Sequence, residues 1–320
     1  MAAIYRFGFE GSTVPAGVSC TGYTTTFPVR FGTTGCNGSV TCQLSNELAV
    51  KASFELFIIA TLAHPDPVFP MEIVNVGNAV YRVRDATTID IKVGTTVVAE
   101  LTVPTIVSGQ CYEVRCCYVS GSAGMCIFEW DGNELTFDAE PGLSLNGNIT
   151  TMTLGSVITN AHAIDNVAVN NASGGIDDDI PPITASFLVQ PDRTGTAFDW
   201  TVPAGYTAVT ALNGASIYSR TTGNVANYYF GVPSDSTITK ASFEGLRIMY
   251  RGIRRTGVVL NKGVSLGYNL AGTNISKEHI TRLGYSSQSR DYTALYDDAG
   301  AKISVAQGDA IQAYLEIIDA

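Results

Sequence analysis

The side chains that could carry out acyl transfer in this 320-residue chain are few and lie far apart. Ser265 stands in the run 263–267, Gly-Val-Ser-Leu-Gly, which matches the nucleophile-elbow formula. That motif requires a strand, a strained turn and a following helix, whereas Ser265 lies inside an alternating strand pattern. His64, His162 and His279 show none of the spacings of a metal site or a catalytic triad. We therefore expect no serine–histidine catalysis and interpret the histidines as loop or surface residues.

Carboxylates are the other candidates, because glycoside hydrolysis needs two carboxyl groups that flank the scissile bond. Two glutamates separated by one residue on a strand would supply such a pair, but the sequence contains no Glu-x-Glu. Glu113, Glu129 and Glu140 fall on separate strands and turns. Because none of these side chains converges with another, the sequence predicts no catalytic residue, no bound cofactor and no enzymatic activity.

All seven cysteines lie within the first 126 residues, and no two of them form a Cys-x-x-Cys pair. That spacing argues against a zinc site. An odd number of cysteines in a protein made in a reducing compartment also argues against a disulfide framework. We expect buried thiols for most of them, and leave open one bridge among Cys20, Cys36 and Cys42.

The net charge of −10 is concentrated in the first half of the chain. Residues 1–172 carry 7 Lys/Arg and 15 Asp/Glu, a balance of −8, whereas residues 183–320 carry 12 and 11, a balance of +1. An acidic body repels phosphate backbones, so we expect no nucleic-acid partner. No apolar run approaches the ~20 residues that span a bilayer, so we expect no membrane insertion. Residues 1–6 show no signal-peptide core, which predicts synthesis in the cytoplasm.

One local stretch is basic, and it contains Arg247, Arg251, Arg254 and Arg255. The period of two in a strand places Arg247, Arg251 and Arg255 on one face. Two interpretations remain open. The strip is a candidate protein interface for an acidic neighbour, such as the first domain of another copy, or it is a solvated strand face.

The elements that must position all these residues are strands. Residues 54–62 alternate with both rows largely apolar, which predicts a central strand covered on both faces. Residues 111–119 and 125–130 predict a strand pair. Asp131-Gly-Asn133 predicts the hairpin turn that follows, because Asp and Gly tolerate positive φ. A short helix is expected at 276–283.

A linker is predicted at 173–182, where small residues, three aspartates and two prolines cannot contribute to a core. Cysteine usage and charge balance both change across this segment. The sequence therefore predicts an all-β chain with two β-sandwich domains, residues 1–172 and the smaller 183–320.

Four segments of the first domain carry a family resemblance. The domain opens on the strand Tyr5–Glu10, contains the strand 111–116, continues to the turn Trp130-Asp-Gly132, and closes on the acidic-start strand Ile164–Val169. This order resembles the concanavalin A-like, laminin-G-like jelly roll. The resemblance implies a jelly-roll fold, in which loop aspartates often bind structural calcium. The weak calcium candidates are Asp131, Asp138, Asp177, Asp178 and Asp179.

The second domain adds three segments, 217–230, 248–255 and 311–318. They are similar to segments of tailed-bacteriophage virion structural proteins. This resemblance implies a non-enzymatic component of the phage particle, as a capsid decoration, a fibre or a tail-associated protein. Its partners would be other virion proteins and further copies in a homo-oligomer, and its location the virion after synthesis in the host cytoplasm.

A carbohydrate-binding adhesin module that recognises host-surface glycans is the alternative. It suits the jelly roll, and it predicts exposed aromatic side chains clustered in loops at one end of the first domain.

Overall fold

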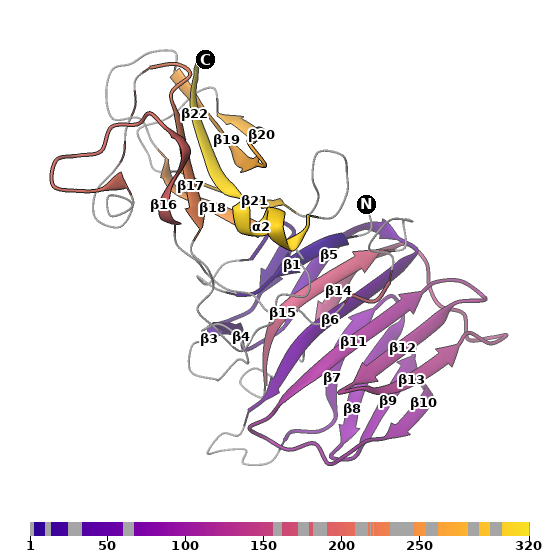
Figure 1. Ribbon diagram of the computed structural model, residues 1–320. Coiled ribbons are helices and arrows are strands. Elements are labelled where there is room, and N and C mark those ends of the chain that lie inside the picture. Colours follow the sequence, from indigo (N-terminus) through magenta and orange to yellow (C-terminus); the bar gives the residue numbers. More distant parts are fainter. Residues whose placement is uncertain are drawn as a thin grey trace. The chain divides into compact units, whose positions relative to one another are not determined.

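The computed structural model describes residues 3–9, 14–24, 34–59, 67–155, 162–171, 179–181, 191–208, 217, 219, 221–230, 246–253, 262–280, 288–294 and 303–319. The chain divides into two compact units, Met1–Leu188 and Val189–Ala320 (Figure 1). Of the expected linker 173–182, residues 179–181 are described, and their contacts place them on the first unit.

The first unit consists of two antiparallel sheets that pack face to face (Figure 1). Sheet A contains, in spatial order, β13 (Asn133–Asp138), β12 (Met125–Trp130), β11 (Cys111–Val119), β6 (Ala49–Ile58), β15 (His162–Asn171), β4 (Gly35–Cys36) and β3 (Tyr23–Thr24), and β1 (Ala3–Phe7) also pairs with β15. Sheet B contains β10 (Thr96–Thr102), β9 (Thr88–Val93), β8 (Ala79–Asp85), β7 (Met71–Val76), β14 (Ile149–Leu154), β5 (Val40–Glu47) and β2 (Val18–Cys20). The predicted all-β, jelly-roll-type sandwich is confirmed.

Alternation along the strands builds the core between the two sheets. On β11, Tyr112, Val114, Cys116 and Tyr118 are buried in this core, and the residues between them point to the outer face of sheet A. Trp130 of β12 stacks on Tyr112 with ring centroids 4.9 Å apart. The large aromatic side chains therefore fill the middle of the core between the two sheets.

A cystine joins the two sheets. Cys20 lies at the end of β2 in sheet B, Cys36 lies on β4 in sheet A, and the two form a disulfide. Of the three cysteines left open by the sequence, these two pair, whereas Cys42 is a buried thiol. The adjacent thiols Cys116 and Cys117 are also buried and point to opposite faces of β11, as expected.

The second unit has a five-stranded sheet with the order β16 (Pro191–Phe198), β17 (Val225–Phe230), β22 (Gln312–Asp319), β19 (Lys262–Leu270) and β20 (Thr273–Ile280). A pair, β18 (Leu246–Ile253) and β21 (Gln288–Ala294), packs on it, and the Tyr250 hydroxyl donates to the carbonyl of Tyr314 at 3.0 Å. This hydrogen bond links the β18–β21 pair to β22, the middle strand of the larger sheet.

The short helix expected at 276–283 is wrong, because β20 runs through Ile280 and pairs with β19. Cross-strand pairing overrides the local helical preference of a few residues. A different short helix, α2 (Val305–Ala310), begins at Ser304, whose side chain accepts from the Gln307 amide in a capping box. Within the described residues, no helix has the length and apolarity needed to cross a membrane.

Candidate functional site

The outer face of sheet A places three carboxylates side by side on its central strands. Glu113 of β11 lies directly opposite Glu55 of β6, and Glu55 lies directly opposite Asp165 of β15. Their strand neighbours, such as Phe54 and Val114, are buried between the sheets, so the three acids share the other face. We call Glu113, Glu55 and Asp165 the carboxylate row.

A β-bulge in β15 lies next to Asp165 and brings Asn166 into contact with the row. The register with β6 shifts between Asp165 and Ala168, and Asn166 adopts a positive φ of 53° there. As a result the Asn166 side-chain amide donates to Glu55 Oε2 at 2.7 Å, and its backbone amide donates to Asp165 Oδ1 at 2.8 Å. Bulges of this kind re-aim side chains next to functional sites.

Two members of the carboxylate row are buried although the row lies on an outer face. Glu55 is 1% exposed and Asp165 is 2% exposed. Burial of charge is costly, and like charges directly opposite each other on neighbouring strands destabilise a sheet. Three acids in register beside a β-bulge, two of them buried, mark the row as a candidate site.

The neighbours of the row are apolar on one side and polar on the other. Phe57, Ile59 and Ala163 form a small cluster with Cys111 on the same outer face. Phe57, Cys111 and Ala163 each lie two residues along their strand from an acid of the row. On the other side, Arg115 forms an ion pair with Glu129 at 2.9 Å. The face therefore offers hydrogen-bond acceptors, donors and an aromatic ring within a few side chains.

This arrangement suits a polyhydroxylated ligand. Carboxylate oxygens accept hydrogen bonds from hydroxyl groups, and a ring such as that of Phe57 packs against C–H faces. The Cβ atoms of residues directly opposite on adjacent strands are about 5 Å apart, which places the acids of the row next to one another. Among the described residues, no group of three or more His, Cys, Asp and Glu side chains could hold a metal ion.

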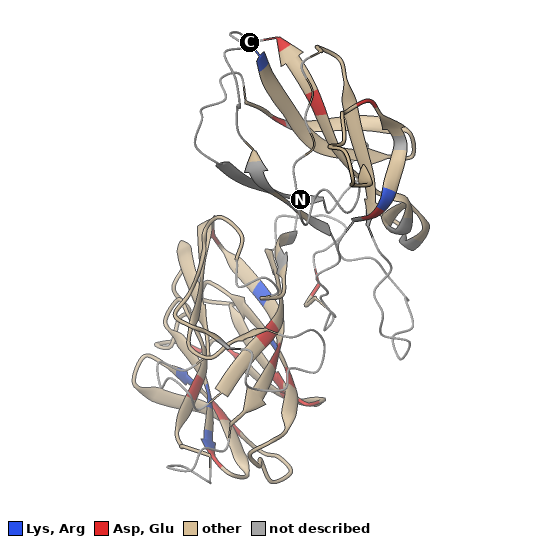
Figure 2. Ribbon diagram, turned by 90° about the vertical axis from the view of Figure 1, so that its left-hand side faces the viewer, with Lys and Arg blue, Asp and Glu red and all other residues tan. Residues whose placement is uncertain are grey.

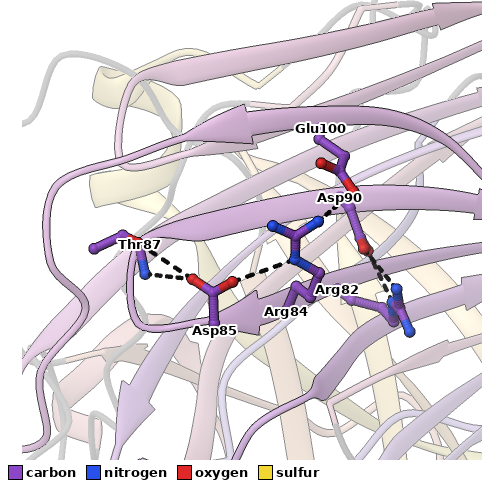
Figure 3. Close-up of polar contacts among 6 residues, drawn as sticks. All are labelled: Arg82, Arg84, Asp85, Thr87, Asp90 and Glu100. Carbon is purple, nitrogen blue, oxygen red and sulfur yellow. Dashed lines mark hydrogen bonds and ion pairs between the residues drawn. The ribbon is translucent and has the colours of Figure 1, made fainter.

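The outer face of sheet B carries charges in a different arrangement (Figure 3). Arg82 of β8 binds Asp90 of β9 through two bonds, Nε to Oδ1 at 2.8 Å and a second guanidinium nitrogen to Oδ2 at 2.5 Å. Arg84 contacts Glu100 of β10, and its Nε lies 3.2 Å from Asp85 Oδ2. Hydrogen bonds from Arg84 and from Thr87 and Thr88 lower the pKa of Asp85, with the Thr87 amide as the largest cause. Each acid here is matched with a cation or a donor.

The aspartates expected to bind calcium do not gather in one place. Asp131 lies in the turn before β13, with φ 48°, and Asp138 ends the same strand. Seven residues of extended chain separate them, roughly 23 Å, so they cannot share one ion. Asp179 is exposed, and its backbone carbonyl accepts from Asn170 at 2.8 Å. Asp177 and Asp178 lie outside the described residues.

The basic strip falls partly outside the described residues. Arg247 and Arg251 belong to β18, whose pairing with β21 is irregular between Tyr250 and Ile253. Arg254 and Arg255 are not described. The interface assigned to this strip stays a prediction.

Of the histidines, His162 differs from its expected role, whereas His279 is exposed and Ser265 lies within a strand as expected. His162 is buried on β15 and not a surface residue; burial lowers its pKa to about 4. Ser265 lies on β19 and the chain turns into another strand, so a nucleophile elbow is ruled out. The Ser265 hydroxyl is nevertheless 2.6 Å from that of Ser276, which is 2.9 Å from His279 Nε2. His64 is not described.

A bulge explains why Ser276 and His279 meet. The register of β20 passes from Glu278 opposite Leu266 to Ser276 opposite Gly267, which leaves Lys277 as an extra residue. Residues three apart in a regular strand face opposite ways, and one extra residue brings them to the same face. The sequence gives no signal for such an insertion.

Exposed aromatic side chains do not cluster at a loop end in the described part of the first unit. Tyr23 is its one large aromatic above 36% exposure, and the other exposed apolar residues are Leu48, Val97 and Val107. The adhesin interpretation therefore rests on the sheet face and not on loops.

The comparisons with known proteins concern the fold. No protein-family model and no curated protein matches the chain. Similar solved structures include an endo-β-1,4-glucuronan lyase from the fungus Trichoderma reesei, with 11% identity, 57% of this chain and 100% of that chain covered, and a TM-score of 0.37. The Emp47p carbohydrate recognition domain gives 9% identity, 53% and 97% coverage and a TM-score of 0.35. Sheep galectin-11 gives 11%, 41% and 97%, and 0.30.

The expectation that the chain has no enzymatic activity is contradicted. The structures of similar fold include alginate lyases and the glucuronan lyase as well as lectin-like domains. An all-β sandwich therefore does not argue against catalysis. The error came from searching for paired acids along one strand, whereas Glu113, Glu55 and Asp165 are paired across strands.

Proposed function

We propose that the first unit binds a neutral glycan on the outer face of sheet A. The observation that carries the proposal is the carboxylate row with the apolar cluster of Phe57 beside it. Glu55, Asp165 and Phe57 are buried, so a glycan reaches them only after their cover is displaced. Its hydroxyl groups then donate to the carboxylates, and the C–H face of a ring packs on the phenyl group.

The charge of the face selects the class of glycan. Acidic residues outnumber basic ones in the described part of the first unit (Figure 2). A uronic-acid polymer carries one negative charge per residue and is repelled by such a surface. A neutral oligosaccharide meets no such barrier, so we assign neutral glycans in preference to uronates.

Calorimetric titration of the full chain with neutral hexasaccharides tests the proposal. The probes are cellohexaose, laminarihexaose and maltohexaose, with an alginate hexasaccharide as the charged comparison. We expect binding of at least one neutral probe and its loss in Glu55→Gln, which removes a charged acceptor at the centre of the row. Glu134→Gln, on the exposed side of edge strand β13, is the matched control and keeps its affinity. Silence with every neutral probe, or equal binding by Glu55→Gln, overturns the proposal.

Glycoside hydrolysis is a second candidate, favoured by the spacing of adjacent acids in the row. A retaining enzyme needs two carboxyl groups about 5 Å apart, one to protonate the leaving oxygen and the other to attack the anomeric carbon, and neighbouring acids of the row have Cβ atoms about 5 Å apart. Proton NMR of the first product formed from a bound hexasaccharide should show the retained anomer. Binding without cleavage leaves the glycan-binding function alone.

The role inferred from the phage resemblance stays a prediction. It comprises the structural part in a virion, the homo-oligomer and the virion location. Mass spectrometry of purified particles, with copy number measured against the major capsid protein, is the test. A glycan-binding face is compatible with an adhesin on such a particle.

A further inference from the structure

A short piece of chain after the last strand of the first unit lies on the same face as the carboxylate row. The backbone carbonyl of Asp179 accepts from Asn170 Nδ2 at 2.8 Å, and that of Ile180 accepts from a guanidinium nitrogen of Arg115 at 3.3 Å. Pro181, the next residue, is buried. Asn170 and Arg115 both point to the outer face of sheet A, because their neighbours Val169 and Val114 belong to the core.

The strand register gives the path of this piece. Asn170 of β15 pairs with Lys51 of β6, and Arg115 of β11 pairs with Ser53 of β6. Residues 179–180 therefore cross from β15 to β11 over β6. Arg115 is two residues from Glu113, so the crossing lies next to the carboxylate row.

We propose that Asp179–Pro181 form a strap that competes with an extended glycan for the outer face of sheet A, an inference that rests on the proposed function. A hexasaccharide centred on the carboxylate row extends beyond one row of side chains in at least one direction along the strands. On the side of Arg115 it meets the strap. The ligand must displace the strap or stop short of it.

The contacts of the strap suit a displaceable element. Both hydrogen bonds run from side chains to backbone carbonyls, so they do not depend on the side chains of residues 179 and 180. One such bond contributes about a fivefold bias between the closed and the open face. Apparent affinity falls by the fraction of molecules that are open, so loss of one bond should tighten glycan binding by about fivefold while the closed form dominates.

A native thiol lies beside the crossing and can be used to monitor it. Cys117 pairs with Lys51, the residue that also pairs with Asn170, and it points to the outer face. Cys117 is 2% exposed, and burial raises the pKa of its thiol to about 11. Its alkylation is therefore slow while the strap is closed. Cys116 and Cys126 are buried in the core and serve as internal controls for unfolding.

The experiment compares the wild-type full chain with Asn170→Ala, which removes the donor to Asp179 without adding charge. Asn133→Ala is the matched control, since Asn133 lies on edge strand β13 and donates to Trp130 in the local turn. Iodoacetamide labelling is followed at each cysteine by peptide mass spectrometry, and affinity is measured with the three neutral hexasaccharides. In Asn170→Ala we expect labelling of Cys117 and glycan affinity both to rise about fivefold, with Cys116 and Cys126 unchanged.

The outcomes separate the strap from the proposed function. Unchanged labelling of Cys117 in Asn170→Ala overturns the strap, and so does faster labelling with unchanged glycan affinity. Equal acceleration at Cys116 and Cys126 assigns the effect to unfolding and overturns it too. If no variant binds any hexasaccharide while Cys117 alone labels faster, the glycan-binding function fails and the cover over sheet A stands.

Discussion

The two outer faces of the first unit treat charge in opposite ways. On sheet B, Arg82 of β8 is paired with Asp90 of β9 and Arg84 of β8 with Glu100 of β10, although Asp90 and Glu100 also lie directly opposite each other (Figure 3). On sheet A, Glu113, Glu55 and Asp165 follow one another in register across three strands. Matched charges are what stability alone requires of a sheet. On sheet A the feature that supports the proposed glycan binding is three acids in register, two of them buried.

The difference teaches how to tell a structural charge cluster from a binding face in an all-β protein. The test is the sign of the stability change on neutralising one member. Loss of a matched partner leaves its counterpart buried and uncompensated, whereas loss of one acid from a like-charged row relieves repulsion. The two faces share one core, so unfolding of the same unit reports on both.

The largest effect is expected at Arg82 on sheet B. Asp90 is fully buried, and Arg82→Met removes both of its guanidinium bonds. We expect the free energy of unfolding to fall by about 3–5 kcal/mol, because a buried carboxylate is left without its cation. Urea unfolding followed by tryptophan fluorescence measures it. Arg82→Met/Asp90→Leu should recover most of the loss; a double variant as unstable as the single one contradicts the interpretation.

Acid should weaken the sandwich through sheet A, at the strand that carries Asp165. Burial lowers the pKa of His162 from 6.5 to about 4, so the unfolded chain takes up a proton that the folded chain refuses. The stability contributed by the neutral ring is complete above pH 6.5 and is lost as pH falls toward 4, by about 3 kcal/mol. Urea unfolding at pH 7 and at pH 4.5 measures the loss. His162→Gln should flatten this part of the profile, and an unchanged slope in that variant assigns the acid sensitivity elsewhere.

Neutralising the centre of the carboxylate row should have the opposite sign. Glu55→Gln keeps an oxygen acceptor for the Asn166 amide and removes one of three like charges. We expect the free energy of unfolding to rise by up to about 1 kcal/mol while glycan binding is lost, a trade of function against stability. A substantial fall in stability would show that Glu55 is a structural acid like Asp90, and the contrast between the faces would disappear.

The strands and turns of the first unit could be predicted because they depend on local chemistry. The alternation in residues 111–119 predicts β11, and Asp131-Gly132 takes up positive φ of 48° and 81° in the predicted turn. The doubly apolar run from residue 54 predicts that both faces of β6 are covered, and Phe54 to Ile58 are buried. Each of these features is set by residues within one or two strand lengths.

The candidate site could not be predicted because it depends on register between distant strands. Glu55, Glu113 and Asp165 come from three strands far apart in the sequence, and no spacing reveals that they are neighbours. The bulge at Asn166 adds a second unknown, since one inserted residue changes which side chains share a face. For the same reason, the contact between Ser276 and His279 could not be predicted from the sequence.

The smallest effect is expected at the exposed end of the sheet B network. Arg84 and Glu100 are 38% and 48% exposed, and the hydrogen bonds that Arg84 donates, to Glu100 first and Asp85 second, raise the pKa of Arg84. Solvent screens such pairs, so Arg84→Met should leave the free energy of unfolding unchanged within error. A double-mutant cycle with Glu100→Gln at low and high salt measures the coupling. A coupling as large as that between Arg82 and Asp90 would contradict this expectation. Burial would then not explain why one ion pair of sheet B stabilises the fold more than the other.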